Sequence, residues 1–229
     1  QIVPKQGPSS ASRPLLSRQT FTFAASVVRR LKQRLAVMVA GTVPSTMATL
    51  AAHGWVSMAR ASSFRDGAPV FAVFLADCRA HMSPPVPDTY IGNCVVPCFV
   101  TLSGAELAGQ DGHARALVAI REAVEEVKRD PLADRSRWNK LKDIPPGRAV
   151  ILAGSPSFTS SYALDFGFGR PAWSEVASMN HDGEIFLIAG REVGSVQASV
   201  AVAADKMKAF REMFVLYSSL KSCDGCSRL

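Results

Sequence analysis

The sequence has no long hydrophobic run and no glycosylation sequon, and its number of cysteines is odd. Its longest apolar run, Val70 to Ala76, is far shorter than the ~18 residues of a membrane span and suits a buried strand. Asn-x-Ser/Thr does not occur, and the five cysteines are an odd number in a chain of 229 residues. Disulfide frameworks are typical of small secreted domains, so we expect reduced thiols and a cytoplasmic location here. Because the longest apolar run is too short for a membrane span, we also expect no membrane contact.

Several catalytic patterns are also missing. There is no Gly-x-Ser-x-Gly elbow and no P-loop, so hydrolase and nucleotide-triphosphatase activities lack support. No two histidines share a ligand spacing, and we therefore predict no metal site. Cys223 and Cys226 have the CxxC spacing without a second pair. A frayed tail is the favoured interpretation there, and a zinc or redox role is the alternative.

The net charge of +7 raises the possibility of nucleic-acid binding. The basic residues are scattered, however, and share amphipathic helices with acidic residues, without RNP-like aromatics or zinc-finger spacing. Solvated helix faces explain them better, so we expect no nucleic-acid partner and keep that function as a distant alternative. A basic surface also suits the phosphates of a nucleotide-tailed cofactor.

Apolar residues alternate between strand and helix periods along most of the chain. Strands are predicted at Phe21–Phe23, 70–76, 94–102 and 150–153, and a hairpin at 185–189 and 195–203. Helical spacing follows residues 28–35, 47–58, 117–127, 138–141 and 207–217. The alternation predicts an α/β fold with a mixed sheet flanked by helices. We expect residues 1–17 to be a linker or severed crossover segment, 18–220 one domain and 221–229 a flexible tail.

Residues 162–171, Tyr-Ala-Leu-Asp-Phe-Gly-Phe-Gly-Arg-Pro, form the most distinctive stretch. Two glycines and a proline exclude a helix, and interior glycines weaken a strand. We predict a tight loop between strands, anchored by its aromatic side chains. Asp165-Phe166-Gly167 also begins the magnesium loop of protein kinases, but no His-Arg-Asp catalytic loop occurs, which excludes that class. A structural glycine turn without chemistry is the plain alternative.

The stretch from Asp165 to Pro171 resembles the DFGWG signature of the BAHD family, the plant acyl-CoA-dependent acyltransferases. Other blocks follow the family in the same order, and together they span Phe21 to Tyr217. They are Asp77-Cys78-Arg79, Pro84-Pro85, Tyr90 to Cys94, Ala153 to Pro156, Ser178 to Gly183 and Gly194 to Phe214. The Tyr-x-Gly-Asn-Cys form looks most like the clade that acylates anthocyanins and phenolic glucosides. Phe168 departs from the commoner Trp, and residues 157–161 depart in length.

The resemblance implies a chloramphenicol-acetyltransferase-like domain, the C-terminal half of an enzyme that uses acyl-CoA as co-substrate. In that family a His-x-x-x-Asp motif supplies the general base, in the half that this chain would lack. None of the four histidines here is followed by Asp at that spacing, so we predict no catalytic residue in this chain. His53 is expected to pack within a helix, and His81, His113 and His181 to be solvated.

Site residues follow from the same resemblance. Asp165 is predicted to pair with Arg79, in a partly buried loop held by Phe166, Gly167, Phe168 and Gly169. A surface pair of little energetic weight is the alternative. Ser45, Thr46 and Ser155 match positions that line the coenzyme A channel; N-capping explains the first two equally well.

The leading hypothesis is therefore transfer of a malonyl or hydroxycinnamoyl group from coenzyme A to a hydroxyl of a phenolic or anthocyanin glucoside. This chain would act with a missing N-terminal half and would be nearly inactive alone. The alternative is a truncated, non-catalytic relative that docks on a full-length enzyme through its exposed apolar face.

Overall fold

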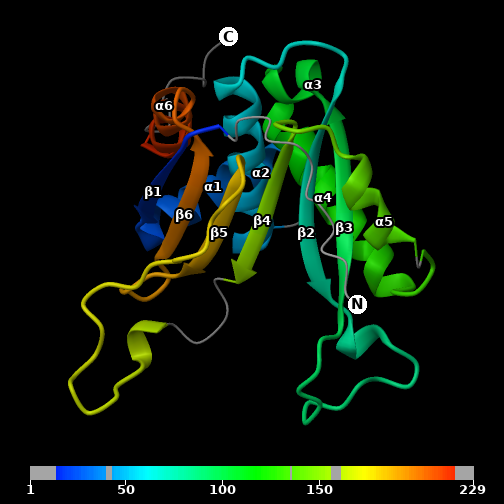
Figure 1. Ribbon diagram of the computed structural model, residues 1–229, viewed down its shortest axis with the longest axis vertical. Helices are drawn as coiled ribbons and strands as arrows, with labels where there is room; N and C mark the ends of the chain where they lie inside the picture. Colours follow the sequence, from blue (N-terminus) through cyan, green and yellow to red (C-terminus); the bar gives the residue numbers. More distant parts are fainter. Residues whose placement is uncertain (1–13, 40–42, 135, 156–160, 220–229) are drawn as a thin grey trace, which may run out of the picture.

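Six strands of the computed structural model form one mixed sheet in the order β1-β6-β5-β4-β2-β3 (Figure 1). The structure describes residues 14–39, 43–134, 136–155 and 161–219. Strands β2, β4 and β5 are parallel, and the β1–β6, β5–β6 and β2–β3 pairs are antiparallel. The bounds are β1 Leu16–Phe23, β2 Pro69–Asp77, β3 Val95–Ser103, β4 Ala149–Ser155, β5 Glu184–Ala189 and β6 Val196–Ala203.

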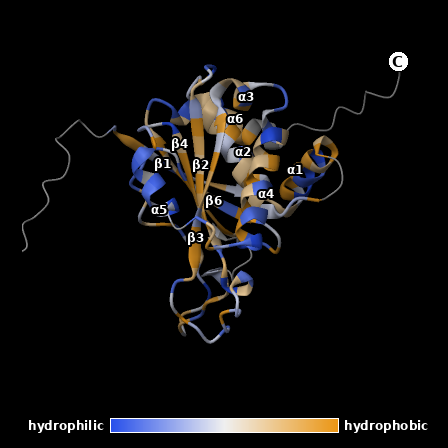
Figure 2. Cartoon of the chain, turned by 90° about the vertical axis from the view of Figure 1, so that its right-hand side faces the viewer, coloured by the Kyte–Doolittle hydropathy of each residue, from blue (hydrophilic) through white to orange (hydrophobic). Residues whose placement is uncertain are grey.

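Helices α1, α2 and α4 form a layer on one face of this sheet, as the side view shows (Figure 2). Helix α2 is apolar on almost every side, and every residue from Thr49 to Ala59 is buried. It packs against α4 and α6, so it lies at the centre of the core. The bounds are α1 Ala25–Met38, α2 Thr46–Ala61, α3 Gly104–Ala108, α4 Gly112–Arg129, α5 Arg137–Lys140 and α6 Met207–Ser219.

The predicted α/β class is confirmed, and each predicted strand and helix has a counterpart. Two details differ. Strand β1 begins at Leu16, because its register continues to Ala203 of β6, so residues 16 and 17 are sheet rather than linker. Helix α3 was not predicted, since five residues are too few for a helical period. A capping box between Ser103 and Glu106 sets its start.

Two long connections leave the sheet at the carboxyl ends of β2 and β4. In Figure 1 they hang below the sheet, the residue 78–94 connection on one side and the described residues 161–183 on the other. In open α/β sheets ligands bind at this end of the strands. The N-terminus of α2 and the turn between β5 and β6 lie at the same end.

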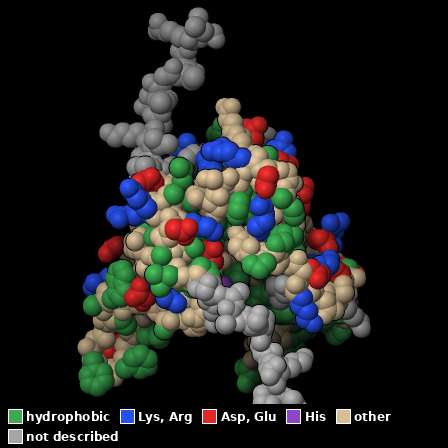
Figure 3. Space-filling model, turned by 45° about the horizontal axis from the view of Figure 1, so that its top comes forward, with side chains coloured by type: hydrophobic (Ala, Val, Ile, Leu, Met, Phe, Trp, Pro, Cys, Tyr) green, Lys and Arg blue, Asp and Glu red, His purple; other side chains and the backbone are tan. Residues whose placement is uncertain are grey.

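Charges of both signs are mixed over the face seen in Figure 3, without a continuous basic patch. None of the described helices combines the length and the hydropathy that crossing a bilayer requires.

Candidate functional site

The Asp165 loop is closed by its own backbone. The Asp165 carboxylate accepts hydrogen bonds from the amides of Gly167 at 2.8 Å and Gly169 at 3.1 Å. Both glycines have positive φ, 94° and 90°, a conformation that glycine adopts without steric cost. The sequence therefore makes a tight turn here, as predicted.

The predicted Asp165–Arg79 pair is wrong. Arg79 instead donates to the Asp77 carboxylate at 2.8 Å and to the Gly92 carbonyl at 2.7 Å. Asp77 lies only two residues away, and its pKa is lowered, first by the hydrogen bond from the Arg79 amide and then by the guanidinium. The Asp165 carboxylate accepts its hydrogen bonds from the loop amides of Gly167 and Gly169 rather than from the arginine.

Two of the three aromatic side chains in residues 162–171 do not anchor the loop. Phe166 is 79% exposed and Phe168 97%, which contradicts the predicted partial burial. Tyr162 is the anchor, so the predicted aromatic anchoring holds for this residue. Its hydroxyl donates to Gln197 Oε1 on β6 at 2.7 Å and accepts from the Ser174 amide at 3.0 Å. Gln197 Nε2 in turn donates to the Ser174 carbonyl.

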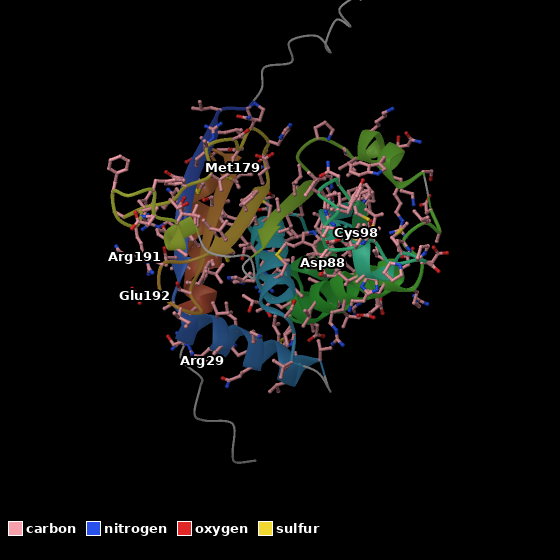
Figure 4. All side chains as sticks on the ribbon, turned by 90° about the horizontal axis from the view of Figure 1, so that it is seen from below. Arg29, Asp88, Cys98, Met179, Arg191 and Glu192 are labelled. Carbon is pink, nitrogen blue, oxygen red and sulfur yellow. The ribbon has the colours of Figure 1, made fainter. Side chains whose placement is uncertain are left out.

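A cavity of about 330 Å³ lies between this anchored segment, the start of α2 and the β5–β6 turn. Figure 4 views this end of the molecule and labels Arg191 and Glu192 on that turn. Its lining includes Thr46, Tyr162, Arg170, Arg191 and Ser195. Thus one predicted coenzyme-binding residue, Thr46, lines a cavity with two arginines for which no coenzyme-binding role was predicted.

The other two predicted coenzyme-binding residues lie differently. Ser45 is the N-cap of α2, and its hydroxyl accepts from the Ala48 amide at 3.1 Å. The N-capping interpretation is thus confirmed for Ser45. Ser155 is the last residue of β4, and its side chain lies outside the described part of the structure.

The cavity is electropositive. Arg170 and Arg191 contribute two guanidinium groups, against the single carboxylate of Glu192. The first turn of α2 carries no acidic residue, so the partial positive charge of the helix N-terminus is uncompensated on its own helix. Such a cavity suits a ligand that carries phosphate or carboxylate groups.

The residues that line this cavity in the described structure include no histidine. His81 and His181 are exposed, as predicted, and His181 contacts Glu184 at 2.6 Å. His113 contradicts its prediction: it is buried in the core with His53. Burial lowers the pKa of His53 to about 4 and that of His113 to about 2. No described histidine is therefore placed to act as base at this cavity.

Comparison with known proteins identifies the family. The Transferase family model matches residues 5–216. A malonyl-coenzyme:anthocyanin 5-O-glucoside-6'''-O-malonyltransferase from Salvia splendens is 29% identical over 96% of this chain and 48% of its own length. An agmatine coumaroyltransferase from Arabidopsis thaliana is 27% identical over 74% of this chain and 38% of its own length. The chain thus spans less than half the length of these relatives.

Solved structures show the same fold. Vinorine synthase superposes with a TM-score of 0.69 at 19% identity, over 86% of this chain and 46% of that one. TRI101 from F. sporotrichioides, complexed with coenzyme A and T-2, superposes with a TM-score of 0.69 at 18% identity, over 92% of this chain and 53% of that one. The sheet and its helical layer are those of the CoA-dependent acyltransferase fold. This chain belongs to the Transferase family of BAHD acyltransferases.

Proposed function

We propose that this chain is the coenzyme-binding half of an acyl-CoA-dependent acyltransferase. The enzyme transfers a malonyl or hydroxycinnamoyl group to a hydroxyl of a phenolic or anthocyanin glucoside. The observation that supports this proposal is the cavity at the start of α2, which is lined by Thr46, Arg170, Arg191 and Ser195. Its guanidinium groups and helix N-terminus suit phosphates, and its hydroxyls suit the amides of a pantetheine arm.

In this proposal the chain positions the donor rather than catalysing the proton transfer. The general base, a histidine that takes the proton of the acceptor hydroxyl, comes from a half that this chain lacks. Removal of such a base forfeits ~10²–10⁴-fold in rate, so the chain alone is nearly inactive. Ser155, at the carboxyl end of β4, and a cytoplasmic location belong to the same proposal.

Titration calorimetry of coenzyme A tests the cavity. The double variant Arg170→Ala/Arg191→Ala removes both cations and should weaken binding at least tenfold, because hydrogen bonds to charged groups contribute about 1.5–3 kcal/mol each. Arg29→Ala is the matched control, since this exposed arginine on α1 does not line the cavity (Figure 4). Equal affinities of the double variant and the control would refute the assignment.

A complementation assay tests the reaction. This chain is mixed with the N-terminal half of a full-length relative, and malonyl-CoA and p-coumaroyl-CoA are offered with a phenolic glucoside. An acylated glucoside supports the proposal. Coenzyme A binding without turnover, together with stable association of the two chains, would favour the non-catalytic docking function instead.

A further inference from the structure

Two cysteines face each other across the base of the β2–β3 hairpin. Cys78 directly follows β2 and Cys94 directly precedes β3, so they continue the register that pairs Asp77 with Val95. The Cys78 amide donates to the Cys94 carbonyl at 3.1 Å. The two Sγ atoms are 3.3 Å apart, and both cysteines are free thiols.

This placement meets the backbone requirement of a disulfide. Residues directly opposite on antiparallel strands have Cα atoms roughly 4.5–5.5 Å apart. A disulfide needs Cα atoms about 4.4–6.8 Å apart and sulfurs at ~2.05 Å. The sulfurs of Cys78 and Cys94 can therefore reach bonding distance by side-chain rotation, without a change of strand register.

The pair is accessible to a small reagent. Both cysteines line a cavity of about 330 Å³, whose wall includes Met82, Leu132 and Trp138. Cys94 is half-buried, whereas Cys78 is only 3% exposed. Cys98 does not line this cavity and lies four residues further along the strand, a separation of roughly 13 Å.

We propose that Cys78 and Cys94 form a reversible redox-modification site, which low-molecular-weight disulfides such as oxidised glutathione convert to an intramolecular disulfide. The Cys94 thiol loses its proton, and the thiolate attacks one sulfur of the reagent. A mixed disulfide forms and one glutathione thiolate leaves. The Cys78 thiolate then attacks the Cys94 sulfur, and the second glutathione leaves. Two electrons pass from the protein to the reagent, and each departing thiolate takes up a proton.

The order of attack follows from the surroundings of the two sulfurs. Burial, and then the hydrogen bond with Cys94, raise the pKa of the Cys78 thiol to about 11. Because the thiolate is the nucleophile, Cys78 is the poorer first attacker. Cys94, the more exposed of the two, meets the reagent first, and Cys78 resolves the mixed disulfide.

The disulfide would link the two ends of the connection between β2 and β3. That segment includes the Arg79 turn and the exposed side chain of Ile91. It lies at the carboxyl end of the parallel strands (Figure 1), so oxidation would restrict the backbone beside the ligand-binding end of the sheet. Figure 4 labels Asp88 on this connection and Cys98 on β3.

Peptide mapping tests the proposal on the full chain. The protein is incubated with oxidised glutathione, blocked with an alkylating reagent and digested with trypsin. Cleavage after Arg65, Arg79 and Arg115 places Cys78 in peptide 66–79 and Cys94 in peptide 80–115. We expect these two peptides to be joined, with the loss of two hydrogen atoms, and to separate after reduction with dithiothreitol. Fragmentation identifies Cys94, not Cys98, as the partner.

Three variants sharpen the result. Cys78→Ser should leave Cys94 as a stable mixed disulfide with glutathione, because the resolving thiol is gone. Cys98→Ala and the double variant Cys223→Ser/Cys226→Ser should still give the joined peptides. Recovery of Cys78 and Cys94 as alkylated thiols, or of mixed disulfides alone in the unmodified sequence, would overturn the proposal. That outcome needs no variant, so it stands even if a substitution impairs folding.

Discussion

His53 and His113 lie face to face in the core, with His53 Nδ1 3.2 Å from His113 Nε2. The other nitrogen of His53, Nε2, lies 2.8 Å from the Phe214 carbonyl oxygen, which can only accept. His53 therefore carries its proton on Nε2 and accepts from His113 through Nδ1. This chain of bonds joins α2, α4 and α6, and burial of both rings favours their neutral forms.

Acid should weaken the fold through this pair. The native pKa values, about 4 and about 2, lie below the unfolded value of 6.5, so the unfolded chain binds more protons in between. The histidine pair makes its full contribution to stability above pH 6.5. As the pH falls from 6.5 towards 4, the free energy of unfolding decreases by about 1.4 kcal/mol per pH unit for each histidine. Urea unfolding at pH 7.5 and 5.5 measures this loss.

The control for the acid effect is His81→Gln, which alters an exposed histidine and should keep the full pH dependence. The double variant His53→Leu/His113→Leu should lose most of it between pH 7.5 and 5.5. If the double variant has the same pH dependence as the unmodified sequence, the buried pair is not its source.

Tyr162→Phe should loosen the loop that it anchors. The change removes the hydroxyl shared by Gln197 and the Ser174 amide, which lowers the free energy of unfolding by about 1–3 kcal/mol. Hydrogen exchange at the Ser174 amide should accelerate. Phe168→Ala is the control, because that ring is 97% exposed and its loss should cost less than about 0.5 kcal/mol.

A double-mutant cycle distinguishes the two possible partners of Arg79. Asp165→Ala and Arg79→Ala should be additive to within about 0.5 kcal/mol, because the two side chains make separate hydrogen bonds. The cycle of Asp77→Ala with Arg79→Ala should show measurable coupling, since their side chains are 2.8 Å apart. Coupling in the first cycle that exceeds the second would restore the pair predicted from the sequence.

Gly154→Ala should damage the junction of β4 and β5. Gly154 has a φ of 86°, and a Cβ there would overlap the Leu187 carbonyl oxygen of the neighbouring strand. We expect a loss of at least about 2 kcal/mol in thermal unfolding. Gly67→Ala is the matched control: its Cβ would meet no atom within 4 Å, so stability should be unchanged or slightly higher.

Strands and helices were predictable because their signals are local. Val70–Ala76 is continuous and apolar, and residues 47–58 have helical spacing, so β2 and α2 follow from short windows. Partners of single side chains are not local. Gln197, which holds Tyr162, lies 35 residues away, and His53 lies 60 residues from His113.

Nearby turn residues also misled the prediction for His113. It follows Gly112, which suggested a solvated turn, but α4 begins at that glycine and its first turn packs on α2. At the candidate site, Thr46 was found through a family resemblance. Arg170 closes the recognised motif and Arg191 lies in a hairpin turn, and only the fold brings both to the start of α2.

The pairing of β1 with β6 constrains how the chain can fold. Leu16 is opposite Ala203, so the edge of the sheet joins segments almost two hundred positions apart. Such contacts carry a large loop-closure entropy and slow the search for the native state. During synthesis, β1 cannot pair until β6 has been synthesised, and the sheet cannot be completed before that point.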